Sequence, residues 1–452
     1  MAACSPYFRR SLDSVSTFIR RATLPCAALL VAGGANGQSS VYGPVDPLAE
    51  PAAVAEAPPG IPDILNEAAT QAAHTYPSIT AGAASVRASA ADIKASRWLR
   101  FPSVQVEGLA NEGISNNSFA NRLGTNLQVD QPIWSGGRIS ASIQRARANK
   151  SFAEATLEAT AQDIALRVLA AYYEVGRATR REAILKDSLA EHERLVDSMS
   201  RRVEQEVSPR SDLDLAQSRA AQVRQDLAIT VAQRYVNMQR LRELVGSETF
   251  DPGPPAVYNR TLHHPATGSA VVQALACDPQ RRRLRAQADV AEADRRSSEA
   301  SILPQVSARY SRNEITGNQV GLVIAAQTNG GLSNIAAAEG ARQREQASVL
   351  QIAVAERELR ETVILDIVDN TSSRDRIDSS DVAVTSSQNV TDSFMRQFIT
   401  GRRTWLDVMN AVREGTSARL AQIDAETTAM QSAGRILLRT CQWRPDMQGP
   451  DQ

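Results

Sequence analysis

Histidine and cysteine are the residues of this chain most suited to metal or nucleophilic chemistry, and it has four of each. The histidines are His74, His192, His263 and His264. His263 and His264 are adjacent, but no cysteine or carboxylate stands near them at the spacing of a metal site. A solvated connector between two larger segments is the simpler interpretation, and we expect neither a metal ion nor a cofactor.

No motif for catalysis or nucleic-acid binding is present. The sequence contains no phosphate-binding loop, dinucleotide fingerprint or nucleophile elbow, so we do not expect an enzyme. The run Arg281-Arg282-Arg283-Leu284-Arg285 is strongly basic, but 50 basic residues are balanced by 50 acidic ones over the whole chain. Nucleic-acid binders usually carry a basic excess, so we interpret the run as a solvated helix face near a membrane and expect no nucleic-acid partner.

The composition favours long helices over a large globular core. Aromatic residues make up only 4% of the chain, and Ala, Arg, Glu, Gln and Ser dominate. No apolar run reaches the roughly 18 residues that a membrane-spanning helix needs.

The N-terminus predicts export from the cytoplasm. Four arginines precede a short apolar stretch, residues 22–32, and small residues follow it, so we expect residues 1–37 to be a signal peptide. A disordered basic tail is the alternative. Cleavage would leave Cys277 and Cys441 as the cysteines of a mature chain in an oxidising compartment.

After a Pro- and Ala-rich linker, residues 38–60, the chain repeats itself once. The prolines at 77 and 102 recur 202 residues later, the glycine pair 136–137 recurs 194 residues later, and segment 210–215 recurs 193 residues later as 403–408. The shorter second spacing implies extra residues in the first copy, as a loop would add. We therefore expect repeat one over 61–248, a connector over 249–268, repeat two over 269–443, and a tail over 444–452.

Each repeat is predicted to contain a helix, two strands and a long helical hairpin. The first helices are expected at 63–99 and 269–301. Polar and apolar residues alternate with a period of two in 101–131 and in 303–328, which predicts two strand pairs with loops near 111–121 and 313–319.

The hairpins are predicted from long proline-free stretches. Proline is absent from 133–208 and from 305–444, which allows helices of roughly 65 residues and on the order of 100 Å. Return helices should cover 210–247 and 403–441. The apolar stripes Leu166, Val168, Leu169, Tyr172, Val175 and Ile352, Val354, Leu359, Val363, Ile367 favour coiled-coil packing.

Four strands cannot close a barrel alone, and an open sheet cannot sit in a membrane. Its edges must therefore meet other chains. Three copies would supply twelve strands, a number suited to an outer-membrane barrel that the helices continue.

This order of elements, over roughly residues 60–443, resembles the TolC family of outer-membrane efflux and secretion channels. Residues 131–137 (QPIWSGG) look like that family's strand-to-helix junction, and residues 206–213 (EVSPRSDL) and 401–408 (GRRTWLDV) resemble its periplasmic turns. The resemblance implies a homotrimer in outer-membrane lipid, with a β-barrel, a periplasmic α-helical barrel, a periplasmic adaptor and an inner-membrane transporter as partners.

The resemblance also implies a gate at the periplasmic tip, formed by Ser211, Asp212, Phe398, Arg403, Asp407 and Asn410. In the family, an arginine at Arg403 and a tyrosine at Phe398 tie neighbouring helices shut, with partners that match Ser211 and Asp212. Phenylalanine lacks the tyrosine hydroxyl, so one hydrogen bond should be missing. Two acidic rings of the family match Asp407 and Asn410, and the asparagine removes one charge per subunit. Asp212 could instead cap a helix, and Asp407 could be an ordinary solvated residue.

Two questions stay open at this stage. In the duplicated architecture Cys277 begins the first helix of repeat two and Cys441 ends the last, so we expect them to form a disulfide, with two free thiols as the alternative. The first-copy turn resembles channels for type I protein secretion more than those for small-molecule efflux. A structural periplasmic coiled-coil protein or an adaptor is the rival class, but it would not explain the strand pairs.

Overall fold

The computed structural model describes residues 57–115, 118–313, 317–326 and 332–445, without the side chains of residues 109–124. The predicted signal peptide, nearly all of the linker, most of the tail and the second glycine pair, Gly330-Gly331, lie outside the described residues.

Both repeats contain the same six elements in the same order. The first has α1 (Asp63–Thr75), α2 (Pro77–Trp98), β1 (Ser103–Ser115), β2 (Ser118–Trp134), α3 (Arg138–Glu204) and α4 (Arg210–Val245). The second has α5 (Ala270–Cys277), α6 (Pro279–Ala300), β3 (Gln305–Asn313), β4 (Gly317–Ala325), α7 (Ser333–Ile399) and α8 (Trp405–Arg439). None of the helices in the described residues is long and apolar enough to cross a membrane.

The first helix of each repeat is broken in two, which corrects the continuous helices expected at 63–99 and 269–301. Tyr76 and Asp278 are extended, with ψ of 131° and 124°, because a proline ring disfavours helical geometry in the residue before it. Pro77 and Pro279 then start the next helix, where a missing N–H costs no hydrogen bond.

The strands form one antiparallel sheet in the order β1-β2-β3-β4, so β2 and β3 join the two repeats. β1 and β2 pair without interruption from Ser103 opposite Asp130 to Ser115 opposite Ser118. The loop expected at 111–121 is therefore mostly strand, and the extra residues of the first copy lengthen the strands. The extra residues suggested a loop, but they extend the backbone ladder of both strands instead.

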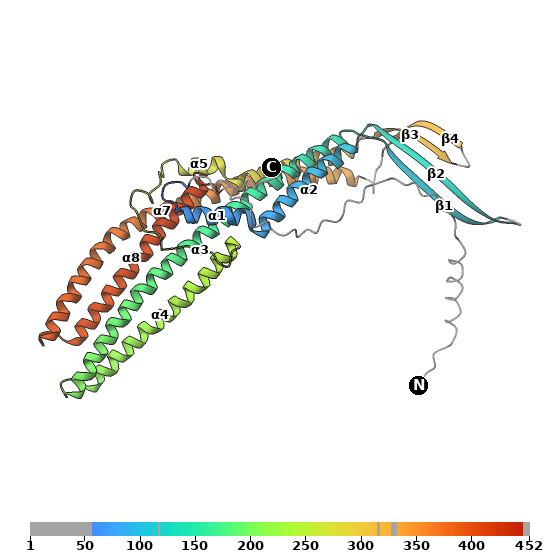
Figure 1. Ribbon diagram of the computed structural model, residues 1–452. Helices are drawn as coiled ribbons and strands as arrows, with labels where there is room; N and C mark the ends of the chain where they lie inside the picture. Colours follow the sequence, from blue (N-terminus) through green and yellow to red (C-terminus); the bar gives the residue numbers. More distant parts are fainter. Residues whose placement is uncertain (1–56, 116–117, 314–316, 327–331, 446–452) are drawn as a thin grey trace, which may run out of the picture. The chain divides into compact units, whose positions relative to one another are not determined.

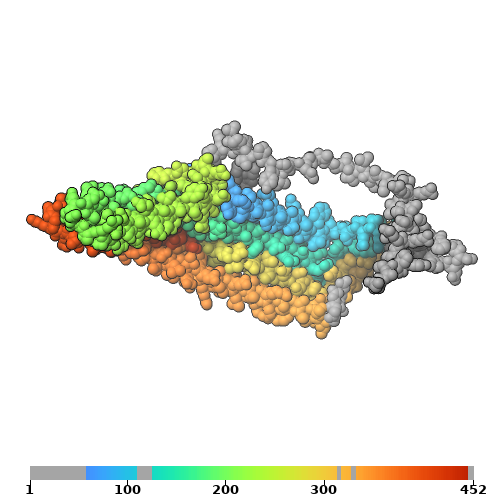
Figure 2. Space-filling model, turned by 90° about the horizontal axis from the view of Figure 1, so that it is seen from below, coloured from blue at the N-terminus to red at the C-terminus, as the bar shows by residue number. Residues whose placement is uncertain are grey.

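The two longest helices, α3 and α7, have 67 residues each and change partners along their length. Near the strands, α3 lies between α2 and α6, and α7 lies beside α6; Figure 2 shows these four helices side by side. Farther along, α3 lies between α4 and α8, and α7 lies beside α8, as the two hairpins in Figure 1 show. α3 is thus covered by two successive pairs of shorter helices, and α7 by α6 and then α8.

The apolar stripes predicted for these helices are only partly correct. Four of the five residues in the α3 stripe, Val168, Leu169, Tyr172 and Val175, are buried. In α7, Val363 is buried but Val354 is 54% exposed. The two residues are nine positions apart, about two and a half helical turns, so they lie on opposite faces of the helix.

The largest apolar core lies where the long helices change partners. It joins α1, α3, α4 and α8 through residues such as Leu65, Leu169 and Leu241. Gly434 of α8 meets α3 so closely there that an added Cβ would lie 2.6 Å from Leu169 Cδ1. Trp443 belongs to this core. It is 2% exposed, and its Nε1 donates to Asn66 Oδ1 at 2.8 Å.

A disulfide joins Cys277 to Cys441 beside this core, the pair expected from the sequence. Cys277 ends α5 rather than beginning the first helix of repeat two, since that helix is broken at Asp278. The disulfide ties the start of repeat two to the segment that follows α8.

We expect thiol labelling of the mature, denatured and unreduced protein to find no free thiol. The bridged residues are 164 positions apart, and the chain-entropy model gives about 5 kcal/mol of stabilisation for a loop of that size. Cys277→Ser should therefore lower the midpoint of the thermal loss of helical circular dichroism, as should reduction of the wild-type protein. Two free thiols in the unreduced wild type would contradict the pairing.

Candidate functional site

The two helical turns, residues 205–209 and 400–404, lie at the end of the helices farthest from the strands (Figure 1). A small apolar cluster joins all four helices next to the turns. It consists of Leu195 and Met199 of α3, Ala216 of α4, Phe398 of α7, and Trp405, Val408, Met409 and Val412 of α8. All six residues expected to form the gate lie in or near this region, on both hairpins.

The left-handed residue of each turn sets the register between the copies. Glu206 has φ 58° and Gly401 has φ 73°, and α4 and α8 each begin four residues later. Asp212 and Asp407 are therefore both third residues of their helices. The register expected from the sequence, which matched 210–215 with 403–408, is wrong by two residues, because the equally long turns match Arg210 with Trp405.

Phe398 is the one gate residue with a buried side chain. It is 7% exposed within the apolar cluster, and the Arg202 guanidinium of α3 lies 5.2 Å from its ring centroid. This cation–π contact links the two hairpins across the repeat. The aromatic ring that replaces the family's tyrosine is thus used for packing between hairpins.

Arg403 is exposed and all of its recorded contacts lie within the second repeat. Its guanidinium lies 4.3 Å from the Phe394 ring centroid, its Nε donates to Gln397 Oε1 at 3.3 Å, and its Nη1 lies 3.8 Å from Asp407 Oδ2. Exposed ion pairs contribute only about 0–1 kcal/mol, so this pair alone holds little.

Asp407 caps the start of α8. Its Oδ2 accepts the Thr404 N–H at 3.4 Å, and Thr404 Oγ1 accepts the Asp407 N–H at 3.3 Å, which is a capping box. In the first repeat Pro209 takes the position of Thr404, and α4 has no side-chain cap. The carboxylate thus has a structural role in α8 that does not depend on any gate.

Ser211, Asp212 and Asn410 lie at the surface of the turns. In the described parts of this single chain, no hydrogen bond or ion pair joins Ser211 or Asp212 to Arg403. Asn410 borders a narrow crevice with His192, Arg219 and Arg413. Segment 396–414 contains four arginines and two carboxylates, so the second turn is not strongly acidic.

The adjacent residues His263 and His264 pack between the connector and the second hairpin. His264 Nδ1 donates to Asn370 Oδ1 at 3.0 Å, and Asn370 Nδ2 donates to Ser432 Oγ at 3.1 Å, which joins the connector to α7 and α8. Burial lowers the pKa of His263. No group of three metal-ligating side chains occurs among the described residues.

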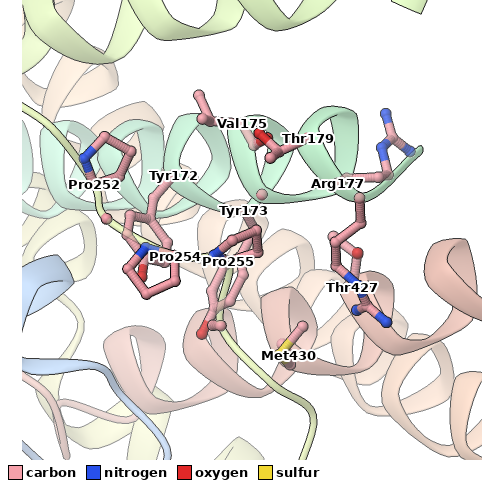
Figure 3. Close-up of a pocket in the computed structure, with 14 residues that line it drawn as sticks. Tyr172, Tyr173, Val175, Arg177, Thr179, Pro252, Pro254, Pro255, Thr427 and Met430 are labelled. Carbon is pink, nitrogen blue, oxygen red and sulfur yellow. The ribbon is translucent and has the colours of Figure 1, made fainter. Parts of the chain in front are cut away.

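A small pocket lies between α3, α8 and the proline-rich start of the connector (Figure 3). Tyr172, Tyr173, Pro254, Thr427 and Met430 are among the residues that line it. Burial raises the pKa of Tyr173, and no partner for its hydroxyl is present in the described residues. The lining contains no paired acid and base and no nucleophile with an activating group, so it offers no catalytic arrangement.

The sequence did not reveal the side chains that Phe398 and Arg403 contact. Arg202 and Phe394 were not selected because neither belongs to a motif, and their roles depend on how the hairpins pack. The landmark segments did place the two turns correctly.

Comparisons with known proteins give one family match over part of the chain and several similar folds. Residues 68–247 match the family described as outer membrane efflux protein. The fold is similar to that of CusC, at 16% identity over 84% of this chain and 92% of that chain with a TM-score of 0.74. It is also similar to VceC from Vibrio cholerae, at 16% identity over 83% and 95% with a TM-score of 0.72, and to OprN, at 18% identity over 83% and 89% with a TM-score of 0.72. No curated protein matches the sequence significantly.

These similarities confirm the expected fold, which is mainly helical with a small sheet. The match of residues 68–247 agrees with the expected resemblance to the TolC family and with an outer-membrane location whose helical part lies in the periplasm. The gate residues are not tested by these findings and stay a prediction.

We expect Arg403→Ala, alone or with Asp212→Ala, to raise the resting conductance in single-channel recordings, because it removes the cation next to Phe394 and Asp407. Asp407→Asn should weaken block by multivalent cations, since it removes one charge per subunit. The amide oxygen of asparagine can still accept the Thr404 N–H, so α8 should keep its cap. Asp407→Ala removes the charge and the reciprocal half of the capping box, while Thr404 Oγ1 still accepts the backbone N–H of residue 407.

Comparing the asparagine and alanine variants separates pore charge from capping. Wild-type conductance and wild-type cation block in Arg403→Ala and Asp407→Asn would mean that these residues are ordinary helix surface.

Proposed function

We propose that this member of the TolC family of outer-membrane channels acts as a homotrimeric export duct. Substrates would enter from an inner-membrane transporter and a periplasmic adaptor, and would leave through the outer membrane. Channels of this family work as trimers with such partners. The observation that carries the proposal for this chain is its open four-stranded sheet, which continues directly into helices of 67 residues.

The sheet has two edges, β1 and β4, without a partner strand in the described chain. Unpaired backbone N–H and C=O groups each cost several kcal/mol in hydrocarbon, so a sheet in a membrane needs its edges paired. Pairing β4 of one copy with β1 of the next would satisfy both edges and would close after three copies with twelve strands. Backbone hydrogen bonding thus supports assembly with neighbouring copies, and three copies agree with the resemblance to the family.

The exposed faces of the edge strands fit a lipid environment. Val104 and Val106 of β1 and Val320, Leu322 and Ile324 of β4 are each at least 65% exposed. In β1 they alternate with Gln105 and Glu107, so this edge strand has one apolar and one polar face; the second face of β4 is mixed, with Gln319 and Val323 on it. A water-filled barrel requires this pattern, with apolar residues toward lipid and polar residues toward the lumen.

Type I protein secretion is the export system that we propose, because the turn over residues 208–214 resembles channels of that kind. Small-molecule efflux is the second candidate, and the family match over residues 68–247 favours it, since that family is described by efflux. A structural coiled-coil protein or an adaptor is a weaker alternative, because neither needs a sheet with one apolar face.

Asn116 stands between β1 and β2 in the sequence and lies outside the described residues. We expect an epitope inserted there to be reachable by antibody on intact cells. β1 ends and β2 begins beside this position, at the tip of the sheet farthest from the helices. The purified protein should also migrate as a heat-resistant trimer in detergent. Labelling that requires a permeabilised outer membrane, or a soluble periplasmic monomer, would contradict the topology.

Deletion of the gene should distinguish the two export systems. For type I secretion, one or a few large proteins should disappear from the medium while drug and metal tolerance stay unchanged. For small-molecule efflux, the secreted proteins should stay unchanged and tolerance should fall. Complementation with the wild-type gene should restore whichever phenotype appears. The double variant Cys277→Ser/Cys441→Ser serves as an expression control, because it should assemble correctly but form a less stable channel.

A further inference from the structure

Three large aromatic side chains are exposed where the first repeat passes from helix to sheet. Trp98 ends α2 and is 68% exposed, Phe101 precedes β1 and is 55% exposed, and Trp134 ends β2 and is 47% exposed. The rings of Trp98 and Phe101 are in contact, with centroids 4.9 Å apart. We call these three residues the aromatic patch.

The aromatic patch lies along one edge of the sheet. Gln131 Nε2 of β2 donates to the Arg100 carbonyl oxygen at 2.9 Å, so the segment before β1 is bound to the last residues of β2. Ser103 lies opposite Asp130 in the ladder, which brings the start of β1 to the end of β2. The three rings therefore mark a single level, the boundary between strands and helices.

Arg97 and Arg100 alternate with the aromatic residues and are exposed. Neither side chain forms an ion pair or a hydrogen bond within the residues that the structure describes. Lys94 is one turn earlier on α2 and is also exposed. Basic residues at a helix C-terminus complement the helix dipole, but that effect does not account for exposed aromatic rings between them.

The second repeat lacks this combination at the equivalent positions. A shift of 202 residues matches α2 with α6, and it places Ala300 at Trp98, Leu303 at Phe101 and Glu299 at Arg97. Glu299 is engaged with Arg295 at 2.7 Å and with Arg342 at 3.1 Å. The two repeats share a fold at this level, but only the first offers aromatic rings with unpaired arginines.

We propose that the aromatic patch, together with Arg97 and Arg100, binds anionic phospholipid headgroups at the periplasmic boundary of the membrane, once per protomer. This inference rests on the proposed function as an outer-membrane channel. Tryptophan prefers the interface between hydrocarbon and water, where its ring is apolar and its N–H can reach a polar partner. Arginine forms strong, charge-assisted hydrogen bonds with phosphate.

Phospholipid fits the patch better than a protein partner does. The patch continues into the exposed apolar face of β1 through Val104 and Val106, which a membrane-embedded sheet turns toward lipid. Arg97 precedes the rings on the helical side and Arg100 stands between Trp98 and Phe101, so both are near enough to the rings for headgroup phosphates to meet them. The second repeat, with its carboxylate at the same level, should bind no anionic lipid.

Fluorescence quenching tests where the rings lie. The wild-type trimer and the variants Trp98→Phe, Trp134→Phe and Trp405→Phe are placed in nanodiscs of phosphatidylcholine and phosphatidylglycerol. The phosphatidylcholine is brominated either near the headgroup or near the bilayer centre. Of the four tryptophans, Trp405 and Trp443 are buried in the protein, so the lipid-quenched emission should come from Trp98 and Trp134.

We expect the bromine near the headgroup to quench more strongly than the bromine at the bilayer centre. The quenched fraction should fall in Trp98→Phe and in Trp134→Phe and should stay unchanged in Trp405→Phe. Absence of quenching, or stronger quenching from the bilayer centre, overturns the anchor. Conductance of the same preparations reports on the channel separately, so a conducting trimer without quenching overturns only the anchor.

Lipid retention tests the arginines. We expect phosphatidylglycerol that stays bound to the trimer through detergent washing to be lost in Arg97→Gln/Arg100→Gln. It should be retained in Arg87→Gln, which removes an exposed arginine of α2 away from the aromatic patch. Equal retention in both variants would show that the arginines do not bind the headgroups.

Discussion

The rest of the structure depends on the need to cover the apolar face of two very long helices. A helix of 67 residues is about three times as long as the helices that flank the strands, α2 and α6, so one short partner cannot bury it. The chain meets this need by giving each long helix different partners at the two ends. For α3, these partners are α2 and α6 near the strands, and α4 and α8 near the turns. Duplication supplies one of the two partners at each end, because α6 and α8 belong to the other repeat.

Most of the interactions that hold the helices in place lie at the level where the long helices change partners. The main apolar core, the Cys277–Cys441 disulfide and the Trp443–Asn66 hydrogen bond all lie there, together with the Asn370 network that holds the connector. At the turns, by contrast, the hairpins are joined by one small cluster and by the Arg202–Phe398 contact. Fewer buried contacts mean a lower free-energy cost of local opening. A gate at the turns could therefore move while the middle of the molecule stays fixed.

The two repeats share a backbone plan but differ in the side chains at both ends. At the strand end the first repeat has exposed aromatic rings and unpaired arginines, whereas the second has Leu303 and an engaged Glu299. At the turns the second repeat has a complete capping box, and the first has Pro209 in its place. Such differences are free to arise because backbone hydrogen bonds and the apolar core define the fold, while these surface positions contribute little to it.

The sequence by itself determined the order of elements, the duplication and the positions of both turns, because these follow from local signals: proline-free stretches, period-two alternation and proline or glycine landmarks. It also predicted a class of protein without catalytic or metal-binding residues. The breaks at Tyr76 and Asp278 were available from the prolines that follow them but were not recognised. The length of β1 and β2 was missed, because strand pairing is a backbone property that polar residues such as Asn111 do not prevent. Only the tertiary structure decided that β2 pairs with β3, that Phe398 packs against Arg202, and that Asp407 corresponds to Asp212 rather than to Asp214. Each of these depends on segments far apart in the chain being brought together, and no local pattern encodes such a distance.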